Sequence, residues 1–190
     1  MKTSATVLAL SLAVASASAA HALDDRFATR LSGFSEVHFL AAPAPALRGA
    51  VSSPARGSFR AQIDDRNDVI HYELRYEDLT GAVTQAHIHF GQTHTVGGIV
   101  VWLCQTDGTP APDTVAALTP FCPGPSEGTV RGTITPAQVL EVAGQGLAAM
   151  QFDELVDAIR AGATYANVHS AIFPPGEIRG QIDGDRGHRH

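Results

Sequence analysis

The chain has 190 residues, two cysteines and a formal net charge of −6 at pH 7. No basic cluster accompanies this charge, which argues against binding to nucleic acid or to an anionic membrane surface. The length suits one domain of ordinary size that can bury its own hydrophobic core.

The first 20 residues have the pattern of a secretory signal peptide. Lys2 supplies the basic start, an apolar run rich in Ala, Val and Leu follows over residues 5–15, and Ala17-Ser18-Ala19 fits the small-x-small cleavage pattern. The apolar run is too short to span a membrane. We therefore expect export to the periplasm or outside the cell, with no membrane span in the mature chain.

Alternating apolar and polar residues predict short strands along most of the remaining chain. They cover residues 34–40, 59–63, 69–76, 82–90, 98–104, 129–135, 164–172 and 177–182. Two short helices are predicted between these strands, one over 137–142 after Thr135-Pro136 and one over 154–160, which Asp153 caps and Gly162 ends. The pattern predicts one all-β domain, an antiparallel sandwich of about eight strands over residues 32–183, followed by a disordered polar tail over 184–190.

The two cysteines, Cys104 and Cys122, flank a loop rich in Pro, Gly and Thr. In an oxidising compartment they are expected to form one disulfide. Closing a loop of this size stabilises a fold by roughly 3 kcal/mol on the chain-entropy model. A catalytic thiol is the weaker interpretation, because the loop contains no histidine.

Two histidines lie two residues apart in the segment Ala86-His87-Ile88-His89-Phe90. On a strand they share one face, while the three apolar side chains point to the core. Their Cα atoms would lie roughly 6.5 Å apart, which lets both rings reach one metal ion at about 2.0–2.1 Å. His169, in a similar strand context, supplies a third imidazole. The alternative is that these histidines are surface residues on a polar face exposed to solvent and bind no metal.

The short link between residues 69–76 and 83–90 favours a hairpin. Matching the apolar faces of the two strands places His71 opposite His89 and Glu73 opposite His87. In this register His71 becomes a candidate fourth ligand. Glu73 becomes a candidate hydrogen-bond partner that orients His87.

The same phase argument applies to the last hairpin, around Pro174-Pro175-Gly176. It places Val168 opposite Ile182 and His169 opposite Gln181. If the two hairpins are neighbours in one sheet, the three histidines can meet.

Several motifs together resemble the chordin-type (CHRD) domain over roughly residues 32–182. They are Tyr72-x-Leu74, Leu79-x-Gly81-x-Val83, Ala86-His87-Ile88-His89, Gly98-Ile99-Val100-Val101, the 153–162 helix, Tyr165-x-Asn167-Val168-His169 and Gly176-Glu177-Ile178-Arg179-Gly180-Gln181. The resemblance implies an extracellular, immunoglobulin-like β domain. It implies no particular biochemical activity. The cysteine-rich modules that bind growth factors in the large animal protein are absent here, so growth-factor binding is not implied.

A weaker similarity is to copper/zinc superoxide dismutase, a β-sandwich enzyme with a His-x-His pair on a strand. The long loop over 105–126 contains no histidine, and its only carboxylates are Asp107 and Asp113. The histidine-rich zinc loop and the bridging imidazole are therefore missing. Dismutase activity is not expected, although copper binding remains compatible with the residues.

These observations predict a secreted CHRD domain that binds one copper or zinc ion through His87, His89 and His169. Imidazole ligands suit these metals better than calcium or magnesium. Metal affinity is expected to fall when the pH drops below about 6.5, the ordinary pKa of histidine, because protonated rings cannot bind metal. The sequence has no Gly-x-Ser-x-Gly motif and no phosphate-binding glycine loop, which favours binding over catalysis. The rival hypothesis is a structural or adhesive module that meets an extracellular protein partner.

Overall fold

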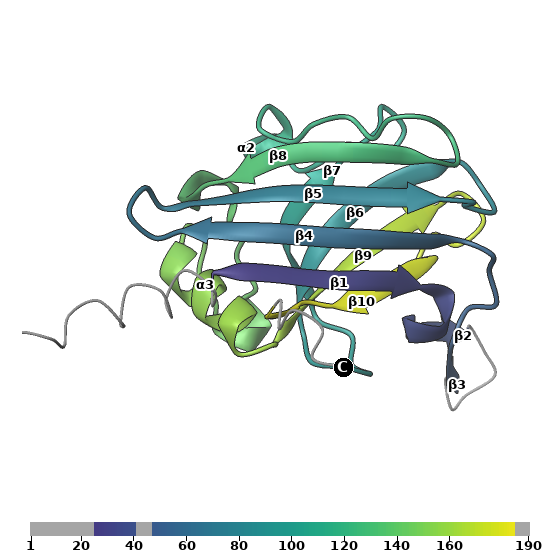
Figure 1. Cartoon of the computed structure of the whole chain (residues 1–190), viewed down its shortest axis with the longest axis horizontal. Coiled ribbons are helices and arrows are strands. Elements are labelled where there is room, and N and C mark those ends of the chain that lie inside the picture. The colour runs from purple at the N-terminus through teal and green to yellow at the C-terminus, as the bar shows by residue number, and fades with distance from the viewer. Residues whose placement is uncertain (1–24, 41–46, 185–190) are drawn as a thin grey trace, which may run out of the picture.

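Two facing layers of antiparallel strands enclose the hydrophobic core of the computed structural model, which describes residues 25–40 and 47–184 (Figure 1). The front layer in Figure 1 contains β1 (Arg26–Ser32), β4 (Arg56–Asp64), β5 (Val69–Glu77) and β8 (Gly128–Ile134). The rear layer contains β6 (Val83–Phe90), β7 (Gly98–Cys104), β9 (Thr164–Ser170) and β10 (Ile178–Gln181). The hydrogen-bonded order is β7-β6-β9-β10-β1-β4-β5-β8, and the terminal strands β7 and β8 are in contact. The predicted all-β antiparallel sandwich is confirmed, and it is nearly closed.

Smaller elements lie outside the eight main strands, with α3 at one end of the sandwich and β2 and β3 at the other (Figure 1). They are η1 (Gly33–Ser35), β2 (His38–Leu40), β3 (Leu47–Gly49), α2 (Asp113–Ala116), η2 (Pro136–Gln138), η3 (Ala143–Gln145), α3 (Phe152–Arg160) and β11 (Asp183–Gly184). The predicted second helix corresponds to α3, and Gly162 follows it with a φ of +66°. The helix begins earlier than predicted, at Phe152, so Asp153 lies in its first turn and is not its cap. The predicted helix over 137–142 is only the single turn η2, because the Leu140 N–H donates to the Val100 carbonyl of β7 and the chain continues as a strand-like segment. None of the helices in the described ranges has the length and apolar character needed to cross a membrane.

The core lies between the two layers, and every second side chain along a strand points into it. In β4 and β5 alternate side chains are buried, among them Phe59 and Leu74, while their neighbours are more exposed. The buried Tyr72 hydroxyl donates across the core to the Leu103 carbonyl of β7, at 2.8 Å. This bond satisfies the one polar group of a side chain that is otherwise packed among apolar neighbours.

The first strand begins earlier than the sequence indicated. Residues 34–40 were expected to form it, but they contain the end of η1 and the short β2, and β1 begins at Arg26. In β1 Phe27 and Leu31 are buried, and the strand pairs with β4, β10 and β11. The predicted signal peptide lies outside the described residues. So does the predicted tail, apart from Gly184, which pairs with Phe27.

The predicted hairpin between residues 69–76 and 83–90 is wrong. β5 pairs with β4 and β8, whereas β6 pairs with β7 and β9. The link between them crosses from one layer to the other, because the Leu79 N–H donates to the Ser126 carbonyl (3.1 Å) and the Val83 N–H to the Pro125 carbonyl (2.7 Å). A third segment thus takes the hydrogen bonds that a hairpin would have used.

The last hairpin forms, but its register differs by four residues from the prediction. Val168 lies opposite Ile178 and not opposite Ile182. The reason is a tight turn in which the Gly176 N–H donates to the Phe173 carbonyl, after which the Glu177 N–H already donates to Val168. Because the shift is an even number of residues, each side chain keeps its predicted face.

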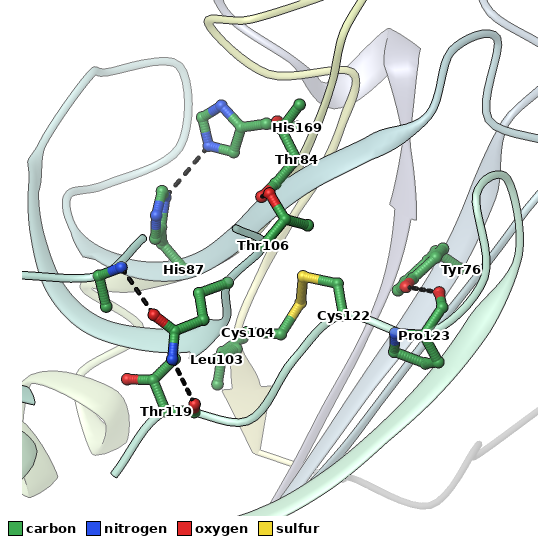
Figure 2. Close-up of a disulfide and its surroundings, with 12 residues drawn as sticks. Tyr76, Thr84, His87, Leu103, Cys104, Thr106, Thr119, Cys122, Pro123 and His169 are labelled. Atoms are coloured by element: carbon green, nitrogen blue, oxygen red, sulfur yellow. Dashed lines mark hydrogen bonds between the residues drawn. A yellow bond between two sulfur atoms is a disulfide. The ribbon is translucent and has the colours of Figure 1, made fainter. Parts of the chain in front are cut away.

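The predicted Cys104–Cys122 disulfide is confirmed, and it fastens the long loop to the end of β7 (Figure 2). The loop packs back onto the outer face of that strand, where Ala111 and Val115 form a small apolar cluster with Trp102. The outer face of the rear layer is therefore covered at this point and is not open to solvent.

Candidate metal centre

Three histidines meet on the outer face of the rear layer, between β6 and β9. In β6 Ala86 and Ile88 belong to the core, so His87 and His89 project to the opposite face. β9 pairs directly with β6, with Gln85 opposite His169. The potential ligand nitrogens of the three histidines all lie within 4.8 Å of one another. The structure thus brings together the three histidines that the sequence singled out.

Backbone carbonyls hold two of these rings and define their protonation. Nδ1 of His89 lies 2.9 Å from the Gly97 carbonyl oxygen, and Nδ1 of His169 lies 2.8 Å from that of Pro174. A carbonyl only accepts, so each Nδ1 carries the proton and each Nε2 carries the free lone pair. Histidine ligands of metal ions in proteins commonly have this arrangement, in which the second ring nitrogen donates to a carbonyl.

The third ring, His87, turns toward His169. Its Nδ1 lies 3.2 Å from Nε2 of His169, and Figure 2 shows the two rings facing each other from β6 and β9. Nε2 of His87 and Nε2 of His89 are both buried and have no hydrogen-bond partner within the described part of the chain. Buried nitrogens of this kind are uncommon, because leaving one unpaired costs about 1–3 kcal/mol.

Aromatic side chains enclose the cluster on two sides. Trp102 meets the His87 ring edge-on, with centroids 4.3 Å apart, and Tyr165 stacks on His89 with centroids 4.7 Å apart and an interplanar angle of 2°. Irregularities in the β6–β7 pairing place Trp102 opposite His87 while Val100 and Val101 both enter the core.

The three histidines are consequently shielded from solvent. His87, His89 and His169 are 0 %, 8 % and 5 % exposed. This burial excludes the alternative that they are exposed residues on a solvated face.

The loop over residues 91–97 closes a third side. The Arg179 guanidinium of β10 donates to the carbonyls of Thr95 (2.7 Å) and Gln92 (3.0 Å), and its Cζ lies 3.3 Å from the centre of the Tyr165 ring. The same loop supplies the Gly97 carbonyl that orients His89. Arg179 and His89 together thus fix the loop against the outer face.

Burial lowers the pKa of all three histidines. For His87, desolvation lowers the pKa well below its ordinary value, and the neighbouring His169 and His89 lower it further. Desolvation lowers the pKa of His89 to about 4, with the charge of Arg179 contributing, and it also lowers the pKa of His169. The rings are therefore neutral at neutral pH and have lone pairs available. Protons are expected to compete for them at a lower pH than the sequence suggested.

The remaining two predicted site residues lie elsewhere, which corrects the register argument. His71 is on β5 in the other layer, opposite Gln62 and Thr133, and it is exposed. Glu73 forms an ion pair with Arg131 at 2.5 Å. Because β5 and β6 are not paired, the structure does not bring His71 or Glu73 to the three histidines.

Other residues of the site were not recognised from the sequence. Tyr165 and Asn167 share the outer face of β9 with His169, a placement that the period of two along this strand could have revealed. Asn167 Nδ2 donates to the Glu36 carboxylate and to the Ile178 carbonyl, which ties the segment before β2 to the site. No sequence signal connects Glu36 with β9, since 131 positions separate Glu36 from Asn167.

The fold and the site define an antiparallel β-sandwich protein with a buried three-histidine cluster outside its core. The family model of the CHRD domain matches residues 27–182, and the chain belongs to this family. The match includes β1 from its second residue onward and all three histidines. No curated protein and no solved structure matches the chain.

Proposed function

We propose that the chain is an exported CHRD-domain protein that binds one transition-metal ion, copper or zinc, through His87, His89 and His169. The observation that carries this proposal is the convergence of three buried imidazoles within 4.8 Å. Two of them have their Nδ1–H groups held by carbonyls, so that their Nε2 atoms carry the lone pairs; that of His89 has no hydrogen-bond partner in the described part of the chain, and that of His169 lies 3.2 Å from Nδ1 of His87.

The distances support a shared ion. The 3.2 Å between Nδ1 of His87 and Nε2 of His169 is the spacing of two ligands that each lie about 2.1 Å from one ion at an angle of about 100°. Binding through that nitrogen requires the His87 proton to move from Nδ1 to Nε2. Two ligands of one ion lie at most about 4.2 Å apart, so a small rotation of the rings must close the widest pair.

Two observations support export. The Cys104–Cys122 disulfide is typical of oxidising compartments. CHRD domains occur in extracellular proteins, and the CHRD match covers the sandwich. Binding alone is proposed for the site, and no catalytic group is assigned.

Metal analysis of the purified chain tests the proposal. After loading with Cu²⁺ or Zn²⁺ and dialysis, the native protein and the His71→Ala control should retain one equivalent, whereas His89→Ala should retain less than about a tenth of one. Circular dichroism of the variants verifies that the sandwich is intact. Excess metal should also raise the unfolding free energy of the native protein, by about 2.7 kcal/mol at a concentration one hundred times Kd.

A native protein that retains no metal, or a His89→Ala variant that keeps a full equivalent, would overturn the proposal. The structural or adhesive role would then be the better account.

A further inference from the structure

We infer that the three-histidine site selects a monovalent ion, Cu⁺, over the divalent ion Zn²⁺. The inference rests on the proposed function, since it assumes that the histidines bind metal. It concerns the charge of the ion that the surroundings of the site accept.

The donor set carries no negative charge. Among residues 25–40 and 47–184, only the three histidines bring potential ligand atoms together at this point. Two buried carboxylates of the same face are engaged elsewhere. Glu36 accepts from Asn167 Nδ2, and Glu177 accepts from the Ser53 hydroxyl (2.5 Å) and the Thr80 N–H (2.8 Å). The ligands themselves would therefore not neutralise a bound ion.

Because the site is buried, the charge of the ion determines how much solvation energy the ion loses on binding. The solvation energy that an ion loses on entering a low-dielectric site scales with the square of its charge, so a divalent ion loses four times as much as a monovalent ion of equal radius. The walls of the site are the rings of Trp102 and Tyr165, which offer no anionic ligand. Zinc bound by three histidines usually adds a water or substrate as its fourth ligand. Cu⁺ needs no fourth ligand, because three-coordinate Cu⁺ complexes are stable.

Arg179 adds a positive charge beside the site. Its guanidinium is held by the Thr95 and Gln92 carbonyls and by the Tyr165 ring, and the Glu36 carboxylate balances part of its charge. Through the Tyr165 ring it lies within about 8 Å of the His89 ring centre, where its repulsion of a divalent ion is twice that of a monovalent one.

Competition titrations of the full chain test the selectivity. Under anaerobic conditions Cu⁺ is titrated against bicinchoninate, and Zn²⁺ is titrated against a fluorescent zinc chelator. Ag⁺ serves as a monovalent probe that does not change oxidation state. We expect the dissociation constant for Cu⁺ to be at least about a thousandfold below that for Zn²⁺, with Ag⁺ following Cu⁺.

Two variants isolate the contribution of Arg179. Arg179→Met removes the charge and should narrow the Cu⁺/Zn²⁺ ratio by about tenfold or more, mainly through tighter Zn²⁺ binding. Arg179→Lys keeps the charge and should leave the ratio within about threefold of that of the native protein.

The outcomes separate the inference from the proposed function. Zn²⁺ binding as tight as Cu⁺ binding, with both lost in His89→Ala, would overturn the selectivity and leave the metal site standing. Failure of every ion to bind in a histidine-dependent way would overturn both. An unchanged ratio in a folded Arg179→Met variant would overturn the role of Arg179.

Discussion

Lowering the pH in metal-free buffer should destabilise the fold before most of its carboxylates titrate. His89 takes up a proton near pH 6.5 in the unfolded chain, but burial lowers its pKa to about 4 in the folded protein. Between these values the unfolded state binds more protons, so the unfolding free energy falls as the pH falls. From His89 alone the loss between about pH 7.5 and pH 5 is about 2 kcal/mol. His87 and His169, whose pKa values burial also lowers, add to it.

Urea unfolding over this pH range, followed by the fluorescence of the single tryptophan, measures the loss. His89→Gln should reduce the pH-dependent loss by about 2 kcal/mol, because it removes one group whose protonation the fold disfavours. His71→Gln, at an exposed position on β5, should leave the loss unchanged. A native unfolding free energy that stays constant from about pH 7.5 to pH 5 would refute the reasoning. It would mean that the folded and unfolded chains bind equal numbers of protons.

Two further changes test the covering of the outer face. The double variant Cys104→Ala with Cys122→Ala should lower the unfolding free energy by about 3 kcal/mol, because the disulfide closes a loop between positions separated by 18. Urea denaturation measures this change, and a loss below about 1 kcal/mol would contradict the prediction. Gly176→Ala should cost about 1–3 kcal/mol, because φ is +138° and the new Cβ would lie 2.5 Å from Glu36 Oε2. Gly144→Ala, with nothing within 4 Å of the new Cβ, is its control, and equal denaturation midpoints would speak against the clash.

The faces of the strands could be predicted from the sequence, because a period of two needs only neighbouring residues. The apolar Ala86 and Ile88 determined which way His87 and His89 point. For His169 the predicted face survived a register error of four residues, since an even shift leaves each side chain on its face.

The pairing of the strands could not be predicted in the same way. The short link from β5 to β6 favours a hairpin on local grounds, yet it crosses between layers because the residues around Ser126, far along the chain, accept its hydrogen bonds. β1 escaped detection because only Phe27 and Leu31 in it are large and apolar. The walls of the site depend on such distant contacts, which is why Trp102 becomes visible as its neighbour only in the folded protein.

The position of β1 has a consequence for the order in which the protein folds. It is the first strand of the sandwich, and it pairs with β4 but also with β10 and β11, so that Phe27 lies opposite Gly184. Contacts between such distant positions form slowly, because the loop-closure entropy must be lost before they contribute. An N-terminal fragment therefore leaves one edge of β1 unpaired and lacks the β9 histidine. The sandwich closes and the metal-binding cluster becomes complete only after nearly the whole chain is present.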